Sequence, residues 1–532
     1  MNFIKRQIEK LGNFAFIKAV LLSKSGILVS MILAGVLASF GFAPFSSFVA
    51  IVAAFSILFL LIFNLNSKKA VFASVLIFFT AQNTITLSWL NFVMEDFGQI
   101  PLVLSFLIEL CFAVYLALPY ALSAALVHTL KRFNKTALTL CFIPIAFCIA
   151  DFIVGYLFTG FPWMYVGNAC IAGPFASYLP LIGVRGVNLM IYVFTAALAL
   201  TATRRFLCLP VAGIVFLIGV LTMGIKFTQE VFTLNIAVVQ GNIKPEVKWD
   251  PQNLMPTVSK YWHLTQPYIK ENTAIIWSES AIPLFIEESE ALLSDLNTVM
   301  HDKKALLITG IQHYDLIKRQ SFNSITVLGD QEKFDISALQ RYDKKHLVPF
   351  GEFVPFESLL RPLGSIFNFP MSGFTKGADK QDPFSVFPYK LMPVICYESI
   401  FPELIQTADN DAINGIVMVS NDSWFGPTRG PQEHLAIAQI RALELQKPII
   451  RATNSGITSI INADGKIVST LPENQDLVLE DKVVLTKGAT PYSRFGNIPL
   501  LVLILVLAFI GFFLGKHKNT AQDTALQHLI RP

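Results

Sequence analysis

Charged residues are scarce in this chain: only 15% of its 532 residues are Asp, Glu, Lys or Arg. Soluble proteins have roughly 25%. The formal net charge of +4 is small and scattered, so we expect no nucleic-acid partner. Hydrophobic residues make up 53% of the chain and concentrate in residues 26–224 and 497–515. The composition therefore predicts a membrane protein with one sizeable polar domain.

Metal-binding patterns are also missing. The eight histidines include no His-x-x-x-His pair. Residues 225–496 hold a single cysteine, Cys396, which excludes a multi-cysteine zinc site there. We therefore expect neither a metal ion nor another cofactor. The solitary thiol has two interpretations: an unpaired cysteine is most often a small buried hydrophobe, but at the end of a buried strand it can serve as a nucleophile.

Eight apolar stretches are long enough to cross a hydrocarbon core, which needs about 20 residues. They lie near residues 26–43, 47–64, 70–90, 101–130, 137–157, 186–203, 207–224 and 497–515. Residues 1–25 are basic and amphipathic; the alternative, a cleavable signal peptide, lacks a small-x-small cleavage site. The predicted organisation is an N-terminal segment (1–25), a membrane domain (26–224), a polar domain (225–496), a last span (497–515) and a tail (516–532).

The basic residues of the short loops predict the orientation in the membrane. Alternate gaps, on the side of the basic N-terminus, hold Lys68-Lys69, Lys131-Arg132, Arg204-Arg205 and Lys516-His517-Lys518. With eight spans, both termini are cytoplasmic and the polar domain lies on the opposite face, which in a bacterium is the periplasm. In that oxidising compartment Cys396 has no partner thiol in its own domain and stays free.

The polar domain alternates short β-branched runs with helical patterns, which predicts an α/β domain with a sheet-rich core. The expected strands are Leu234–Gln240, Ala274–Trp277, Ala305–Ile311, Ser324–Leu328, Met392–Ile395, Gly415–Val419, Ile449–Ala452 and Ile457–Ile461. The expected helices are Pro256–Tyr268, Ser289–His301 and Glu433–Gln446. Runs as apolar as Gly415–Val419 predict strands that are covered on both faces.

Three ionisable residues of this domain stand out: Glu279, Lys344 and Cys396. Glu279 and Cys396 each follow an apolar run, and ligands of open α/β sheets bind outside the carboxyl ends of strands, so the two can converge. Each residue also has a simple explanation: a strand end or helix cap for Glu279, and a charged surface turn for Lys344. Together they supply the base, the cation and the nucleophile that thiol acyl transfer requires.

Longer segments around these residues resemble a known family. Trp277–Pro283, Tyr342–Glu352 and Cys396–Glu398 resemble signatures of the nitrilase (carbon–nitrogen hydrolase) superfamily. Over nearly its full length the chain is similar to the membrane branch of that superfamily, the apolipoprotein N-acyltransferases, notably in Thr159–Trp163 and Ser420–Phe425. The resemblance implies eight spans plus a nitrilase-like α-β-β-α sandwich.

The resemblance also implies site residues. Glu279 is expected to be the general base, Lys344 the oxyanion-stabilising cation and Cys396 the acyl-accepting nucleophile. Other expected site residues are Glu352, Tyr397, Glu398 and Asn323 near the triad, and Trp249, Trp424, Phe425 and Gly160 on lipid or substrate loops. The chain departs from the family at Ser278 and Ser280, where Pro and Ala are expected. Lys345 directly follows Lys344, and of these two lysines we expect Lys344 to point inward.

The family implies a ping-pong reaction. Cys396 takes an acyl chain from a phospholipid, typically phosphatidylethanolamine, as a thioester, and the α-amine of a diacylglyceryl-cysteine on an apolipoprotein attacks it. The expected protein is a monomer in the bacterial inner membrane. Two other classes of protein are alternatives. A membrane-tethered nitrilase-type amidase would share the triad and stays open. A transporter or scaffold would need a broken triad, and here the triad is intact. Phe367–Phe374 is either a lipid-touching arm or a buried loop.

Four further polar residues have structural interpretations. His346 and His434 are each able to serve a Cys–His dyad. We expect instead that His346 is a structural neighbour of Lys344 and that His434 lies on a packed or solvated helix face. Asp151 and Glu109 fall inside predicted spans, where ionisable side chains are expensive. Each therefore has either a functional role or a hydrogen bond between helices.

Overall fold

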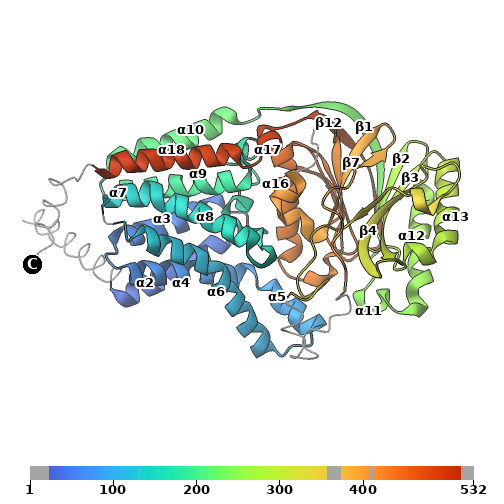
Figure 1. Ribbon diagram of the computed structural model, residues 1–532, viewed down its shortest axis with the longest axis horizontal. Coiled ribbons are helices and arrows are strands. Elements are labelled where there is room, and N and C mark those ends of the chain that lie inside the picture. Colours follow the sequence, from blue (N-terminus) through green and yellow to red (C-terminus); the bar gives the residue numbers. More distant parts are fainter. Residues whose placement is uncertain (1–22, 131, 356–372, 407–410, 517–532) are drawn as a thin grey trace, which may run out of the picture.

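Two parts make up the molecule: a bundle of apolar helices and a two-sheet α/β domain that packs on one end of the bundle (Figure 1). This computed structural model describes residues 23–130, 132–355, 373–406 and 411–516. Most of the predicted N-terminal segment and tail, and residues 367–372 of the predicted arm, lie outside the described residues.

Helices coincide with each of the eight predicted apolar stretches. The main helices of the bundle are α2 (Lys24–Ser39), α3 (Phe48–Asn64), α4 (Lys68–Thr86), α5 (Trp89–Phe92), α6 (Leu102–Val127), α7 (Lys135–Ala137), α8 (Ile143–Tyr156), α9 (Leu179–Ala202), α10 (Leu209–Thr222) and α18 (Ile498–Lys516). Short π-helical segments, Val93–Phe97 and Leu138–Phe142, continue α5 and α7.

Not all of these helices are long enough to cross a membrane alone. Within the described ranges, four helical segments have the length and the apolar composition: Leu102–Val127, Lys135–Thr159, Ala176–Ala202 and Ile498–Gly515. Lys68–Thr86 and Trp89–Phe97, bent by 53°, make a fifth if they form one span. The shorter apolar helices are Lys24–Ser39, Phe48–Asn64 and Phe206–Thr222. The number of eight spans therefore stays a prediction.

Helix α9 begins at Leu179, before the predicted start at residue 186. Its first turns are interrupted at Gly183, whose φ of +67° is not helical. A Cβ atom there would lie 2.3 Å from the ring of Tyr492, so the close approach requires glycine. The break frees the N–H of Val184, which donates to Glu444 Oε1 at 2.7 Å. The irregular helix start thus binds the α/β domain.

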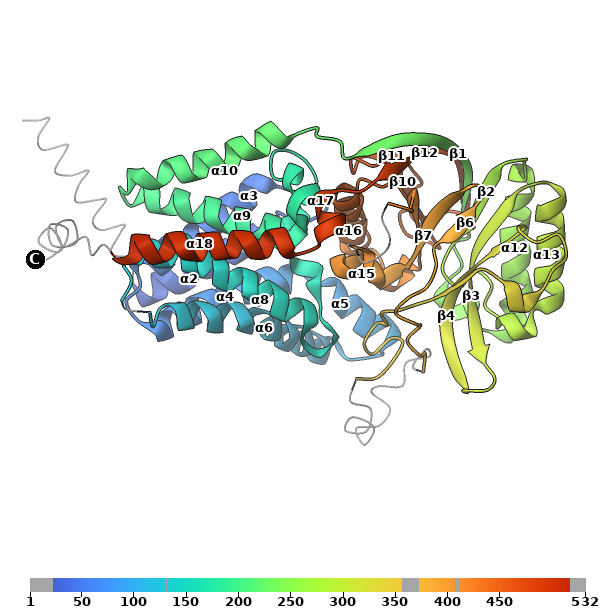
Figure 2. The same cartoon turned by 45° about the horizontal axis from the view of Figure 1, so that its top comes forward.

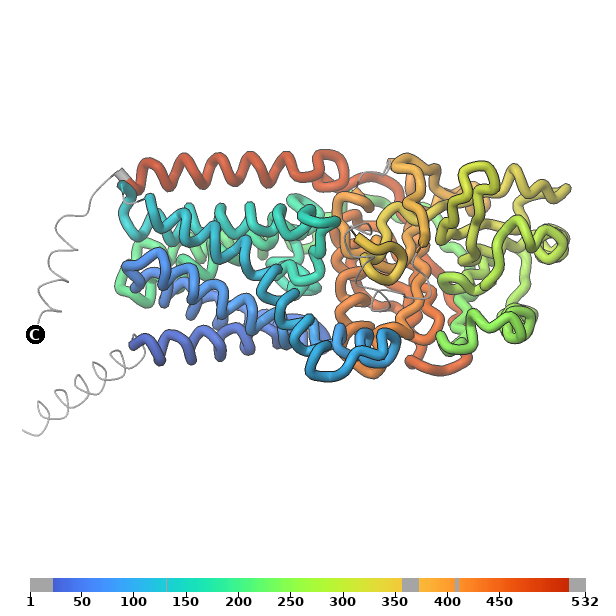
Figure 3. Tube along the Cα trace, turned by 60° about the horizontal axis from the view of Figure 1, so that its bottom comes forward, coloured from blue at the N-terminus to red at the C-terminus, as the bar shows by residue number. Residues whose placement is uncertain are grey.

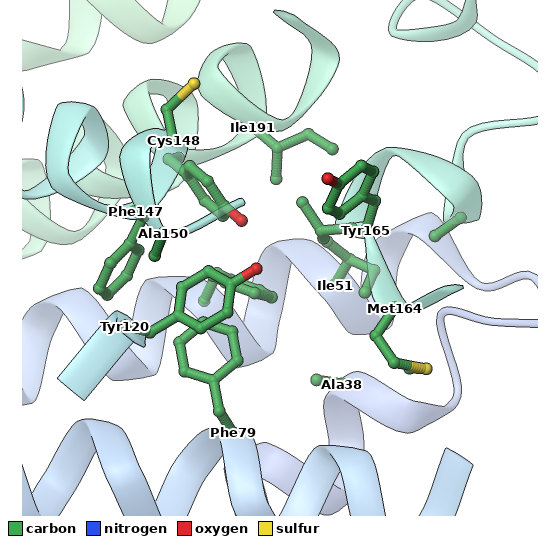
Figure 4. Close-up of a cluster of buried hydrophobic side chains, with 14 of the residues drawn as sticks. Ala38, Ile51, Phe79, Tyr120, Phe147, Cys148, Ala150, Met164, Tyr165 and Ile191 are labelled. Atoms are coloured by element: carbon green, nitrogen blue, oxygen red, sulfur yellow. The ribbon is translucent and has the colours of Figure 1, made fainter. Parts of the chain in front are cut away.

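The bundle has an aromatic core with a buried carboxylate in it. Figure 4 shows Tyr120 and Phe79 among the side chains packed between the helices. Asp151 of α8 accepts hydrogen bonds from Tyr120 at 2.5 Å, Asn188 at 2.9 Å and Tyr192. The second carboxylate within the predicted spans, Glu109, accepts one from Asn91 at 2.7 Å. The expected hydrogen bonds between helices are confirmed for both carboxylates.

The α/β domain consists of two six-stranded sheets. The first has the order β12-β1-β2-β3-β4-β5, with strands β1 (Thr228–Gln240), β2 (Thr273–Trp277), β3 (Leu306–Asp315), β4 (Gln320–Leu328), β5 (Arg341–Asp343) and β12 (Leu477–Gly488). The second has the order β11-β10-β9-β8-β7-β6, with β6 (Phe384–Val386), β7 (Tyr389–Ile395), β8 (Gly415–Ser420), β9 (Ile449–Thr453), β10 (Ser459–Ile461) and β11 (Ile467–Thr470).

All eight predicted strands exist, and four others were missed: β5, β6, β11 and β12. The long strand β12 pairs with β1 in antiparallel register from Leu477 to Gly488. The centre of β12 has the charged sequence Glu480-Asp481-Lys482. An edge strand tolerates charged residues because one of its faces is open to solvent. The apolar run that revealed the buried strands is therefore absent from β12.

Helices cover the outer faces of both sheets, which gives the predicted α-β-β-α sandwich (Figure 2). Helices α12 (Leu254–Thr265) and α13 (Glu290–Asp302) pack on the first sheet. Helix α16 (Gly430–Leu445) packs on the second sheet and faces the bundle. Between the sheets lies a core of side chains such as Val238, Ile276 and Val417.

The two parts are joined by chain connections and by packing. Figure 3 follows the chain into the sandwich after α10 and back into α18, which runs along the bundle. Side chains also cross the boundary: Trp163 Nε1 donates to Glu433 Oε2 at 2.7 Å, and Arg185 forms an ion pair with Glu403. The bundle core extends without a break to Phe401 and Phe425 of the sandwich. The membrane part thus supports the loops at this end of the sandwich.

Candidate active site

The ends of strands from both sheets bring the predicted triad together. Glu279 follows β2 and Lys344 follows β5 in the first sheet, while Cys396 follows β7 in the second. Lys344 Nζ lies 3.5 Å from Glu279 Oε1 and donates to Glu352 Oε1 at 2.8 Å. Asn323 of β4 donates from Nδ2 to both carboxylates, at 2.7 Å to Glu279 and 2.9 Å to Glu352. One amide and one ammonium therefore connect the two glutamates.

Lys344 is the lysine that points inward, since only 1% of its side chain is exposed. Burial lowers the pKa of Lys344, but the charges of Glu352 and Glu279 outweigh burial, so its pKa lies above the ordinary value. Lys345 is half-buried, with its Nζ 5.4 Å from the centre of the Tyr342 ring. The structure thus separates a permanently charged inner lysine from an outer one.

Cys396 directly follows β7 and is the first residue of a 3-10 helix, Cys396–Ile400. Its backbone conformation is unusual. Its φ is +49°, in the left-handed region that favours glycine. Part of the residue is exposed, while burial, with a contribution from Glu279, raises the pKa of the Cys396 thiol to about 12. Lys344 and a hydrogen bond with Ser420 act in the opposite direction. The resting thiol is therefore protonated at neutral pH and needs a base to react.

Glu398 connects the loop that carries Lys344 and Lys345 (the lysine loop) to the loop that carries Cys396 (the nucleophile loop). The carboxylate is fully buried and accepts hydrogen bonds from the Tyr342 hydroxyl at 2.9 Å and from the backbone N–H of Lys345 at 2.6 Å and of Ile395 at 2.8 Å. The sequence left open whether this residue orients the lysine or accepts protons. Its bonds to backbone on both sides favour orientation of the lysine loop.

A polar network behind the nucleophile was missed in the sequence. His434 of α16 is fully buried, with Nε2 3.2 Å from the carbonyl oxygen of Cys396 and 2.9 Å from Ser399 Oγ. Its Nδ1 lies 3.2 Å from Asp422 Oδ1, and Asp422 also pairs with Arg451. The network holds the carbonyl of the strained Cys396 residue. The sequence showed only a histidine on a helix, which is usually a packed side chain.

The other histidine near the triad is a structural neighbour, as predicted. The His346 ring packs against Phe401 with centroids 3.7 Å apart. Burial and the charge of Lys344 lower the pKa of His346 to about 4, so its ring is neutral at pH 7.

Residues of the predicted substrate loops come from both parts of the molecule. Tyr397 donates to the carbonyl oxygen of Gly160 at 3.3 Å. Trp424 contacts Phe97 of the bundle at 4.6 Å between ring centroids, and Phe425 contacts Trp89 at 4.9 Å. Trp249 lies on a separate loop, after α11 (Pro245–Lys248). The nucleophile loop and one aromatic loop thus rest on helices of the bundle.

The chain matches two protein families over most of its length. Residues 34–198 match the family described as "Apolipoprotein N-acyltransferase N-terminal domain", and residues 235–486 match "Carbon-nitrogen hydrolase". An apolipoprotein N-acyltransferase from Vibrio cholerae is 35% identical over 489 residues, which cover 90% of this chain and 95% of the relative. The enzyme of that name from Shewanella oneidensis is 34% identical over 501 residues, covering 91% and 95%. The chain belongs to the apolipoprotein N-acyltransferase family.

A solved carbon–nitrogen hydrolase superfamily protein from Xanthomonas campestris, with an arsenic adduct in its active site, is 16% identical with a TM-score of 0.35. The alignment covers 52% of this chain and 97% of that chain. In this apolipoprotein N-acyltransferase family member, the two matched regions correspond to the helical bundle up to α9 and to the sandwich from β1 to β12. Gly160 and Trp163 belong to the first region, and the triad belongs to the second.

Gly160 offers a test of how the two family regions fit together. The residue has a φ of +83°, and a Cβ atom there would lie 1.9 Å from the carbonyl oxygen of Gly155. We expect Gly160→Ala to destabilise the acyltransferase by about 2 kcal/mol or more and to displace the carbonyl that Tyr397 contacts. The measurement is thermal unfolding of the purified protein together with acyl transfer.

Gly213→Ala is the matched control, because no heavy atom lies within 4 Å of a Cβ built there. Equal melting temperatures and activities for Gly160→Ala and Gly213→Ala would contradict this account of Gly160.

Proposed function

We propose that this acyltransferase N-acylates the α-amine of the S-diacylglyceryl-cysteine of apolipoproteins through a thioester on Cys396. The observation that carries the proposal is the position of Lys344. Its buried ammonium lies 3.5 Å from Glu279 and 2.8 Å from Glu352. Lys344 follows β5 in the first sheet, and Cys396 follows β7 in the second. A base, a cation and a thiol in this arrangement are the parts that thiol acyl transfer needs.

In the first half of the proposed reaction, Glu279 accepts the proton of the Cys396 thiol. The sulfur attacks the ester carbonyl of a phospholipid, and Lys344 stabilises the oxyanion that forms on the carbonyl oxygen. When the carbon–oxygen ester bond breaks, the proton on Glu279 passes to the leaving alkoxide. The products are a thioester on Cys396 and a lysophospholipid.

The second half uses the same groups in reverse. The α-amine of the diacylglyceryl-cysteine attacks the thioester, and Glu279 accepts a proton from the amine. Collapse of the tetrahedral intermediate forms the amide and releases the Cys396 thiolate, which recovers its proton from Glu279. Asn323 and Glu352 position the base and the cation throughout.

The proposed setting is the bacterial inner membrane, with eight spans, both termini cytoplasmic and the catalytic domain in the periplasm. The alternating basic loops and the apolar helices support this topology. The proposed acyl donor is phosphatidylethanolamine, and the protein acts as a monomer. Trp249, Trp424, Phe425 and Gly160 are proposed to line the path of the lipid substrates. Contacts of Trp424 and Phe425 with aromatic side chains of the bundle support this path.

Intact mass measurement tests the thioester. We expect the purified protein, incubated with phosphatidylethanolamine vesicles, to gain the mass of one acyl chain, and we expect hydroxylamine to remove it. Cys396→Ala should gain no mass, while Cys111→Ala, which changes an exposed cysteine of α6, should behave as wild type. No increment in a wild-type sample that transfers acyl chains would refute the thioester.

A membrane-tethered amidase with the same triad is the second candidate. The aromatic contacts between the nucleophile region and the bundle favour a lipid-anchored acceptor over water. A diacylated lipopeptide added to the acylated enzyme distinguishes the two: transfer predicts N-acylated lipopeptide, whereas an amidase releases free fatty acid.

A further inference from the structure

A second buried lysine lies against the base and has no role in the mechanism above. Lys248 ends α11, and its side chain is buried with 1% exposure of the residue. Its Nζ donates to the backbone carbonyl oxygen of Glu279 at 2.8 Å. Among the ion pairs of the described ranges, none includes Lys248, so its charge is not neutralised by a direct carboxylate contact.

The charge of Lys248 nevertheless acts on Glu279. Burial lowers the pKa of Lys248 to about 8, and the nearby carboxylate of Glu279 opposes this effect. A Coulomb interaction is reciprocal, so the ammonium and the carboxylate attract each other. Lys248 is therefore a second cation, besides Lys344, in the surroundings of Glu279.

The turn that carries Glu279 needs support from outside its own chain segment. Ser280 has a φ of +47°, a left-handed conformation that is costly for a residue with a Cβ atom. On one side the turn packs closely on β3, since a Cβ atom at Gly310 would lie 2.3 Å from Ser280 N and 2.6 Å from Ser278 O. On another side Lys248 holds the Glu279 carbonyl. The turn is thus fixed between a strand and a buried cation.

We propose that Lys248 is a positioning residue for the general base: its ammonium holds the Glu279 carbonyl and fixes the Ser278–Ser280 turn that carries Glu279. The inference rests on the proposed role of Glu279. The charged or titratable groups that face Glu279 are Lys248 from α11, Lys344 after β5, Glu352 and Cys396 after β7. Lys344 is shared by two carboxylates and lies closer to Glu352 than to Glu279. Lys248 is therefore the second cation near Glu279.

The test is the rate of thioester formation on Cys396, followed in a single turnover by mass. We expect Lys248→Met to slow thioester formation about 10- to 100-fold, because the turn that carries Glu279 loses the group that holds its carbonyl. Lys248→Arg retains a charged donor and should restore most of the wild-type rate.

Two further variants separate the hydrogen bond from the general cost of removing a buried lysine. Lys248→Gln retains a donor for the Glu279 carbonyl without the charge, and it should form the thioester faster than Lys248→Met. Lys447→Met is the matched control: Lys447 is also fully buried and donates to a backbone carbonyl, that of Thr486, at 3.3 Å. It should leave the rate of thioester formation unchanged.

A wild-type rate of thioester formation in folded Lys248→Met would overturn the inference, even if the variant melts at a lower temperature. That result leaves the proposed function intact, because the wild type still forms the thioester. Absence of the thioester in wild type would instead refute the proposed function, and with it the role of Lys248.

Discussion

Glu279→Gln is expected to slow thioester formation on Cys396 by about 10³-fold or more at pH 7 while the protein stays folded. The reason is the nucleophile's own acidity: the pKa of the Cys396 thiol is raised to about 12. Only roughly one thiol in 10⁵ ionises unaided at pH 7 with such a pKa. Glutamine keeps the size of the side chain and an oxygen for Asn323 but accepts no proton. The measurement is the single-turnover rate of the acyl mass increment.

The pH dependence of the variant gives a sharper result. Without the base, the rate should rise about tenfold per pH unit on the alkaline side, because the thiolate fraction rises in that way below the thiol pKa. Glu287→Gln is the control, since Glu287 is a partly exposed glutamate of the same domain that contacts His313. A Glu279→Gln rate equal to that of wild type would show that another group takes the thiol proton.

Lys344→Met is expected to remove both activity and stability. The substitution leaves Glu279 and Glu352, 8% and 6% exposed, without their shared cation. Removal of one partner from a buried ion pair costs about 3–5 kcal/mol, and loss of an oxyanion donor costs about 10²- to 10³-fold in rate. The measurements are the melting temperature in detergent and the single-turnover acylation rate.

A second substitution tests whether the loss comes from the two carboxylates left without a cation. Lys344→Met combined with Glu352→Gln should regain stability but not activity. Lys345→Met, at the half-buried neighbouring lysine, is the control. An equal melting temperature for Lys344→Met and Lys345→Met would contradict the proposed charge balance.

Local patterns in the sequence were sufficient where burial is nearly complete. The eight apolar stretches coincide with helices, and the strands around Ile275, Ile395 and Val417 were predicted because these buried strands are continuous apolar runs. Strand β12 escaped prediction, because an edge strand with one solvated face mixes charged and apolar residues. The start of α9 escaped for another reason: Gly183 adopts a non-helical φ that only packing against Tyr492 explains.

The candidate site shows the same division. Glu279, Lys344 and Cys396 were recognised from residue types at strand ends and from family signatures, and the structure brings them together. Whether Lys344 or Lys345 points inward was decided by the Glu398 carboxylate, which holds the backbone of the lysine loop. His434 had no distinctive motif in the sequence, since its contact with Cys396 joins residues 38 positions apart.

By itself, the sequence determined the class of this protein: an acyltransferase with an apolar helical part and an α/β part, and a thiol with a candidate base and a candidate cation. The length of an apolar run and the types of its residues are local properties, so they can be recognised from the sequence alone. Only the tertiary structure decided how the charges are divided, with Lys344 between Glu279 and Glu352 and Lys248 against the backbone of the base. Electrostatic interactions depend on distance and burial, and both are set by the packing of segments that are remote in the chain.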